Sequence, residues 1–122
     1  MAEFVPIFKP GQSWTSTTSA DVTAGQALVV TGQDTVAASS AANPSFVGIA
    51  AFDAKSGEKV TVLSGGGVYE LTSTGTVNDG DALTTAASGA VTALGAGTTY
   101  SQVIGVALAD AASNKVKALL FR

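Results

Sequence analysis

The chain has 122 residues, the size of one domain, and carries a formal net charge of −3 with only 12% charged residues. Just over half of the residues are Ala, Gly, Ser or Thr, so the apolar core is small for the length. There is no His and no Cys, which excludes a disulfide framework, a thiolate zinc site and the commonest catalytic bases. Scattered basic residues and the absence of a long apolar run disfavour a nucleic-acid or membrane partner.

Residues 1–10 form a short segment unlike the rest of the chain. Phe4, Ile7 and Phe8 are apolar without a clean period, and Pro6 and Pro10 block both a helix and a central strand. We therefore expect an extended arm, folded over the end of its own domain or docked on a neighbouring chain. The start of the chain lacks the features of a secretory signal, so synthesis in a cytoplasm is expected.

From residue 11 onward the chain is predicted to form strands. Runs rich in β-branched and aromatic residues alternate with Gly-, Asn- and Asp-containing turns at the spacing of a sandwich or barrel. The clearest predicted strands are residues 27–31, 46–52, 59–63, 67–71, 103–108 and 115–121. Residues 47–52 do not alternate and are expected to be buried on both faces, whereas Lys115-Val116-Lys117 alternates and predicts one wet face. Gly48 and Gly105 predict a bulge or a close backbone approach.

Two sequence motifs recur in the same order. Residues 22–28 match residues 77–83 at Val, Gly, Ala and Leu, and residues 47–54 match residues 104–111 at Gly, Ala, Asp and Ala. The pattern predicts an all-β, compact barrel- or sandwich-like fold: a single domain over 11–122, built from two units, 11–65 and 66–122, packed around a pseudo-two-fold axis. Coincidence in a sequence of low complexity is the alternative.

Candidate catalytic and metal sites are weak. Asp53 and Asp110 occupy equivalent places, but neither is followed by the Thr/Ser-Gly of an aspartic dyad, so each is expected to accept backbone N–H bonds in a turn. The 78–81 segment, Asn-Asp-Gly-Asp, lacks the distal Glu of a calcium loop. We therefore predict no enzyme, no catalytic residue, no cofactor and no metal.

Both halves of the chain resemble the small capsid decoration (cement) proteins of tailed bacteriophages. The similarity covers residues 20–121 and rests on a pattern of Gly, Val and Ala. The segments that carry it are residues 27–30, 47–50, 59–63 and 67–71 in the first half, and residues 80–83, 89–91 and 103–107 in the second.

This resemblance implies a β-tulip-type fold and a structural protein on the exterior of the virion, often a homotrimer. Such a protein clamps neighbouring subunits of the major capsid protein after the shell expands. The resemblance assigns capsid contact to the N-terminal arm, and the residues expected to make it are Phe4, Pro6, Ile7, Phe8 and Trp14. The alternatives are a tail, fibre or baseplate domain, and a carbohydrate-binding module that would use Tyr69 and Tyr100.

Overall fold

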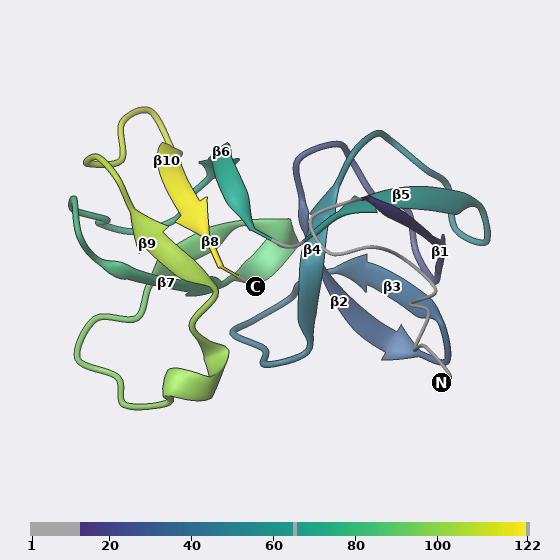
Figure 1. Cartoon of the computed structure of the whole chain (residues 1–122), viewed down its shortest axis with the longest axis horizontal. Helices are drawn as coiled ribbons and strands as arrows, with labels where there is room; N and C mark the ends of the chain where they lie inside the picture. Colours follow the sequence, from purple (N-terminus) through teal and green to yellow (C-terminus); the bar gives the residue numbers. More distant parts are fainter. Residues whose placement is uncertain (1–12, 65, 122) are drawn as a thin grey trace, which may run out of the picture.

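The computed structural model describes residues 13–64 and 66–121, and their fold is all-β, as predicted (Figure 1). The strands are β1 (Trp14–Thr18), β2 (Ala27–Gly32), β3 (Thr35–Ala38), β4 (Phe46–Ala50), β5 (Lys59–Leu63), β6 (Gly67–Thr72), β7 (Ala82–Thr85), β8 (Val91–Ala93), β9 (Gly105–Ala107) and β10 (Lys115–Leu120). Two 3₁₀ turns, η1 (Ala87–Gly89) and η2 (Tyr100–Gln102), join strands of the second half. Within the described ranges, no helix has the length and apolar character needed to cross a membrane.

The first five strands form a closed barrel in the order β1-β3-β2-β4-β5. All neighbours are antiparallel except β1 and β3, which run parallel. Closure depends on β1, which pairs with β5 through Trp14 opposite Val62 and with β3 through Thr17 opposite Thr35. Closing the sheet leaves no free strand edge in this half except at the strand ends.

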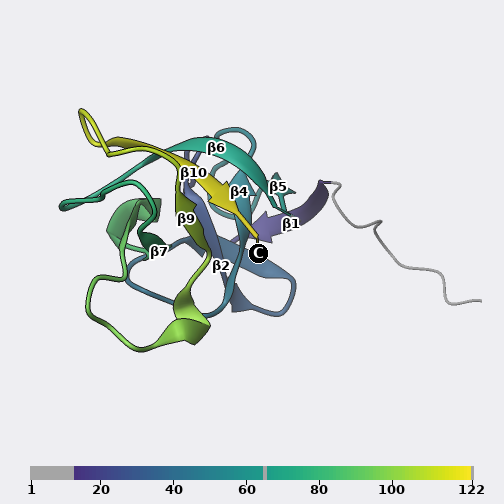
Figure 2. The same cartoon turned by 60° about the vertical axis from the view of Figure 1, so that its left-hand side comes forward.

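The last five strands repeat this arrangement less completely. They form an antiparallel sheet in the order β6-β10-β9-β7-β8, and Figures 1 and 2 show β10 between β6 and β9. A single parallel bridge between Ser73 and Val91 links the two outer strands. Thr18 and Val36, 55 positions earlier, form the corresponding parallel pair in the first barrel. Each strand of the first half therefore has a counterpart five strands later, with the same neighbours.

Turn contacts recur with the same spacing. Gly25 N donates to Ala50 O at 2.9 Å, and Gly80 N donates to Ala107 O at 2.8 Å. The side-chain amines of Lys59 and Lys115 each contact a threonine hydroxyl on the neighbouring strand: Thr17 at 2.7 Å and Thr72 at 3.0 Å. We propose that the chain consists of two copies of one unit, with the boundaries 11–65 and 66–122 expected from the sequence.

The glycines Gly48 and Gly105 sit where two backbones approach closely, as the sequence suggested. A Cβ atom at Gly48 would overlap the carbonyl oxygen of Leu63, and one at Gly105 would overlap that of Leu119. The register between β2 and β4 also shifts at this point, and Gly48 has a φ of +156°. Only a residue without a side chain fits here without displacing the neighbouring strand.

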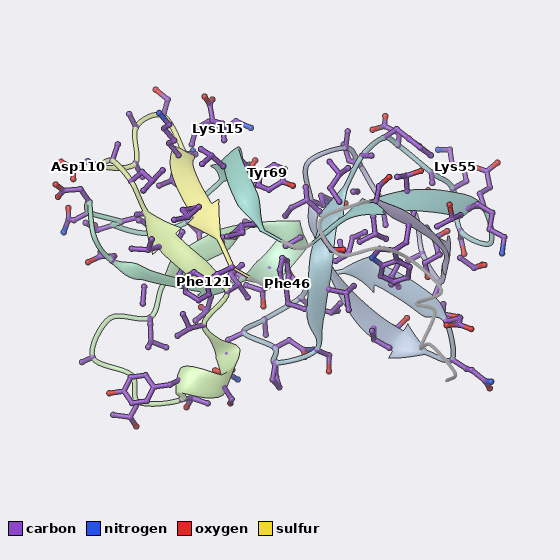
Figure 3. All side chains as sticks on the ribbon, viewed as in Figure 1. Phe46, Lys55, Tyr69, Asp110, Lys115 and Phe121 are labelled. Atoms are coloured by element: carbon purple, nitrogen blue, oxygen red, sulfur yellow. The ribbon has the colours of Figure 1, made fainter. Side chains whose placement is uncertain are left out.

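Two apolar cores hold the molecule together. The first fills the barrel and includes Leu28, Val36, Val60 and Val62. The second combines the interior of β6–β10 with residues from the outer surface of the barrel, and Phe46 is its largest contribution from the barrel. Figure 3 shows Phe46 at the junction between the two halves, so the second core joins them into one body.

Some sequence expectations were incomplete or wrong. The strands β1, β3, β7 and β8 were not among the clearest predicted runs because Thr, Ser and Ala dominate them. Residues 46–50 are largely buried, but the expected burial fails at Phe52, which is 46% exposed because the strand ends at Ala50. On β10, buried and exposed residues alternate, as predicted from Lys115-Val116-Lys117.

Candidate functional site

Trp14 is the one predicted contact residue that lies within the described residues; Phe4, Pro6, Ile7 and Phe8 lie outside them. The indole of Trp14 is half-buried and packs against the core of the first barrel. Its Nε1 donates to Ser64 Oγ at 3.0 Å, immediately after β5. Trp14 therefore fixes the point at which the N-terminal segment joins the barrel.

Asp53 and Asp110 have the structural role expected for them. Asp53 Oδ1 accepts from Ala24 N, and Asp110 Oδ1 accepts from Asp79 N, each at 2.8 Å. Figure 3 places Asp110 at one end of the molecule and Lys55, two residues after Asp53, at the opposite end. The two carboxylates thus close separate turns and do not form a pair.

The 78–81 segment is also a turn. Asp81 Oδ2 accepts from Asn78 N at 2.9 Å, as Gln26 Oε1 accepts from Thr23 N at 2.8 Å in the first unit. Across residues 13–64 and 66–121, no group of three or more potential metal-ligating side chains comes together.

Two hollows on the surface are lined mainly by turn residues. One, of about 270 Å³, lies over Asp21, Asp53, Lys55 and Glu58. Glu58 Oε1 accepts from Lys55 N, and Asp21 Oδ1 accepts from Ser56 N, each at 2.8 Å, so two of these carboxylates already bind the turn itself. The other hollow, of about 390 Å³, lies between the two halves and is lined by Gln26, Glu70, Gly89 and Lys115 among others.

An apolar row lies partly exposed on the outward face of the second sheet. We define the apolar row as Val106 on β9, Leu119 on β10 and Val68 on β6, which are successive cross-strand partners. Val68 is 54% exposed and Leu119 39% exposed, and Phe121, two residues farther along the chain, is 59% exposed. Along the same face the next cross-strand pair is Lys117 opposite Glu70, so the face changes from charged to apolar along the strands.

Sequence reasoning missed this row although its pattern was present. Lys115 and Lys117 predicted the wet face of β10, and continuing the same alternation places Leu119 on that face. The interior is formed instead by Val116, Ala118 and Leu120. Leu119 does not stand alone in this position, because Val68 and Phe121 are exposed beside it and together they form an apolar patch.

The tyrosines considered for a carbohydrate-binding surface differ in their environment. Tyr69 packs against the second core, and its hydroxyl lies 3.5 Å from Gly66 O. Tyr100, in η2, is 70% exposed. Of the two tyrosines, only Tyr100 is therefore largely exposed.

Comparison with known proteins gives a family and a related structure. A family model described as phage cement protein matches residues 8–121. The solved structure of the head fiber gp8.5 N base in bacteriophage phi29 is similar, with a TM-score of 0.67, 20% identity, and coverage of 89% of this chain and 92% of that chain. At this identity the likeness shows a shared fold, and no curated protein matches this chain significantly. Because the family model spans nearly all of the described β structure, the chain belongs to the phage cement protein family and is a structural protein of the phage virion.

Proposed function

We propose that this protein binds the outer surface of an expanded phage capsid and stabilises it by linking neighbouring subunits of the major capsid protein. The observation that carries the proposal is the match of residues 8–121 to the phage cement protein family, which supports the capsid as the place of contact. The partly exposed apolar row with Phe121 beside it is suited to contact with another chain, and self-association is its proposed use.

The N-terminal arm is the proposed contact with the capsid. Burying Phe4, Ile7 and Phe8 would contribute roughly 1.5–3 kcal/mol each before the cost of ordering the arm. Pro6 favours an extended backbone, which limits that cost. Because Trp14 is held in the barrel by packing and by its bond to Ser64, a load on the arm would be transmitted to a rigid body.

Self-association, as a homotrimer, would strengthen this attachment. Several arms on one assembly engage several capsid subunits, and after the first arm binds, the others bind at a high effective concentration. Modest affinity of each arm is then sufficient. An assembly whose arms reach different subunits also ties those subunits together, which is the proposed stabilising effect.

Replacing the apolar residues of the arm tests the proposal. We expect the triple variant Phe4→Ser, Ile7→Ser, Phe8→Ser to fold normally but to lose most of its co-sedimentation with expanded heads. The double variant Glu3→Ser, Lys9→Ser changes the same arm without removing apolar area and should bind like the unmodified protein. The unmodified protein should also raise the temperature at which expanded heads open. Full binding by the triple variant would show that the arm is not the capsid contact.

A second candidate function is the base of a head fibre. It is favoured by the extent of the fold similarity to the head fiber N base of phi29, which covers about nine-tenths of each chain. Electron cryomicroscopy of virions separates the possibilities. Density flush with the shell supports a cement role, density extended outward into a fibre supports a fibre base, and density on the tail contradicts both.

A further inference from the structure

Within the chain, the turn between β7 and β8 of the second unit packs on the segment that follows β3 in the first unit. We call this segment, residues 39–43, the seat. The turn follows β7: Thr85 Oγ1 donates to Ala41 O at 2.8 Å, and Gly89 N donates to Ser39 O at 2.9 Å. Ser39 Oγ in turn donates to Ala86 O at 2.7 Å. Thr85 is completely buried by this contact. The turn of the second unit therefore closes over one end of the first barrel.

Beside this seat, the outward face of the first barrel is apolar and covered. Ile49 on β4 lies opposite Leu63 on β5, and Ile49 is only 2% exposed. Both belong to the second core or pack against it, together with Phe46. The first unit thus buries an outward apolar row under the unit that follows it.

This packing is not the pseudo-two-fold arrangement expected from the sequence. A two-fold axis would bury equivalent residues equally and repeat each bond with the units exchanged. Instead, Leu119 is 39% exposed and Val106 is only partly buried, although they pair where Leu63 and Ile49 pair in the first unit. Among the described residues, the bonds from Ser39 to Ala86 and from Thr85 to Ala41 have no exchanged counterpart.

Each unit therefore has both a turn and a seat. The turn of the first unit and the seat of the second unit have no partner among the described residues. The counterpart of Thr85 is Val30, because Val30 pairs with Val36 as Thr85 pairs with Val91. Val30 lies in β2, two residues before the strand ends at Gly32, and is 44% exposed. The vacant seat lies beside the apolar row of the second unit, as the occupied seat lies beside Ile49.

In the unpartnered turn and the unpartnered seat, an apolar residue stands where the occupied contact has a polar one. Leu94 takes the place of Ser39, since Leu94 N donates to Ala82 O as Ser39 N donates to Ala27 O. Ser39 and Thr85 each donate a side-chain hydrogen bond across the occupied contact. Their counterparts, Leu94 and Val30, have no side-chain donor. Leu94 O already accepts from Gly97 N at 3.2 Å, so a contact at the vacant seat would depend on apolar packing and not on copied backbone bonds.

We propose that a second copy of this chain fills the vacant seat, with Val30 and the β2–β3 turn of one copy packed against Leu94 and the apolar row of the next. A terminal repeat that needs no partner has a polar outer face, whereas this one is apolar at Val106, Leu119 and Val68. The charged part of the face holds Lys117 opposite Glu70, so the apolar row and the repeated contact within the chain, not charge, support the contact. Such a head-to-tail contact is heterologous, and it generates a closed ring when the rotation between copies closes.

This inference specifies the self-association included in the proposed function and rests on that part alone. It is tested in solution without heads, so its failure is separate from a failure of capsid binding. We expect the full chain to sediment as an oligomer, and Val30→Lys and Leu119→Lys each to shift it to a monomer. Phe52→Lys makes the same kind of change at a 46% exposed position outside both surfaces and should leave the oligomer intact. Circular dichroism confirms that each variant is folded.

Cross-linking distinguishes a head-to-tail contact from a two-fold contact. The chain has no Cys, so single substitutions Val30→Cys and Leu94→Cys introduce unique thiols. A mixture of these two variants should be cross-linked by a short bismaleimide, whereas either variant alone, or Val30→Cys mixed with Phe52→Cys, should not. A monomeric unmodified protein at high micromolar concentration would overturn the proposal. Cross-linking of Val30→Cys with itself would overturn it as well.

Discussion

At the scale of single residues, equivalent residues in the two halves of the molecule make the same local contacts. Asp53 and Asp110 each hold the turn that begins β2 or β7 by accepting one backbone N–H. Gly48 and Gly105 each allow a neighbouring carbonyl to approach the backbone. Substitutions at equivalent positions are therefore informative in pairs.

Adding a methyl group at either glycine should destabilise the fold. We expect Gly48→Ala and Gly105→Ala to lower the free energy of unfolding by about 1–3 kcal/mol each, because the new Cβ meets a backbone oxygen that cannot move without disturbing a strand. Gly48→Ala should cost more, since φ at this position is also unfavourable for alanine. Gly32→Ala, whose Cβ would lie 3.7 Å from its nearest neighbour, is the control. Urea unfolding measures all three, and equal stabilities would contradict the close approach.

At the scale of elements, the two units differ in the turn before their last strand, which spans residues 51–58 in the first and 108–114 in the second. In the first unit, Thr18 Oγ1 donates to Lys55 O at 2.7 Å inside this turn. In the second unit the turn is one residue shorter, and Ser73, the counterpart of Thr18, has a buried hydroxyl that bonds to nothing among the described residues. The shorter turn provides no hydrogen-bond partner for this hydroxyl.

This difference predicts opposite responses at equivalent positions. Thr18→Val keeps the shape but removes the donor, and should cost about 1–2 kcal/mol of stability by leaving the Lys55 carbonyl without its partner. Ser73→Ala removes an unsatisfied group and should be neutral or stabilising by up to about 1 kcal/mol. Thermal unfolding of the two variants tests the prediction. A similar loss in both would show that Ser73 has a partner after all.

At the scale of the whole molecule, Phe46 links the two halves. It is the first residue of β4, it is 4% exposed, and it lies in the core formed mainly by the second unit. The halves are therefore expected to unfold together as one cooperative body. Rigidity of this kind suits the proposed role of holding capsid subunits at fixed positions.

Truncating Phe46 should weaken the junction more than either half. We expect Phe46→Ala to cost about 3–5 kcal/mol, as for other buried aromatic residues, and to separate the unfolding of the two units. Phe52→Ala, at the other end of the same segment but 46% exposed, should change stability by less than about 0.5 kcal/mol. Calorimetry reports both effects. A single transition with little loss for Phe46→Ala would mean that the polar seat alone joins the units.

The sequence by itself determined the all-β class, the recurrence of two short motifs, the outward face of β10 and the resemblance to phage cement proteins, which the family model confirms. These features depend on local patterns: β-branched runs, turn residues and the alternation of side chains along a strand. Tertiary structure decided what covers each face. Local pattern places Ile49 and Val106 on equivalent outward positions, and only the packing of the second unit over the first buries one and leaves the other in the apolar row. Burial depends on contacts distant in sequence, and for that reason Phe46 and Phe52, alike in the sequence, have opposite environments.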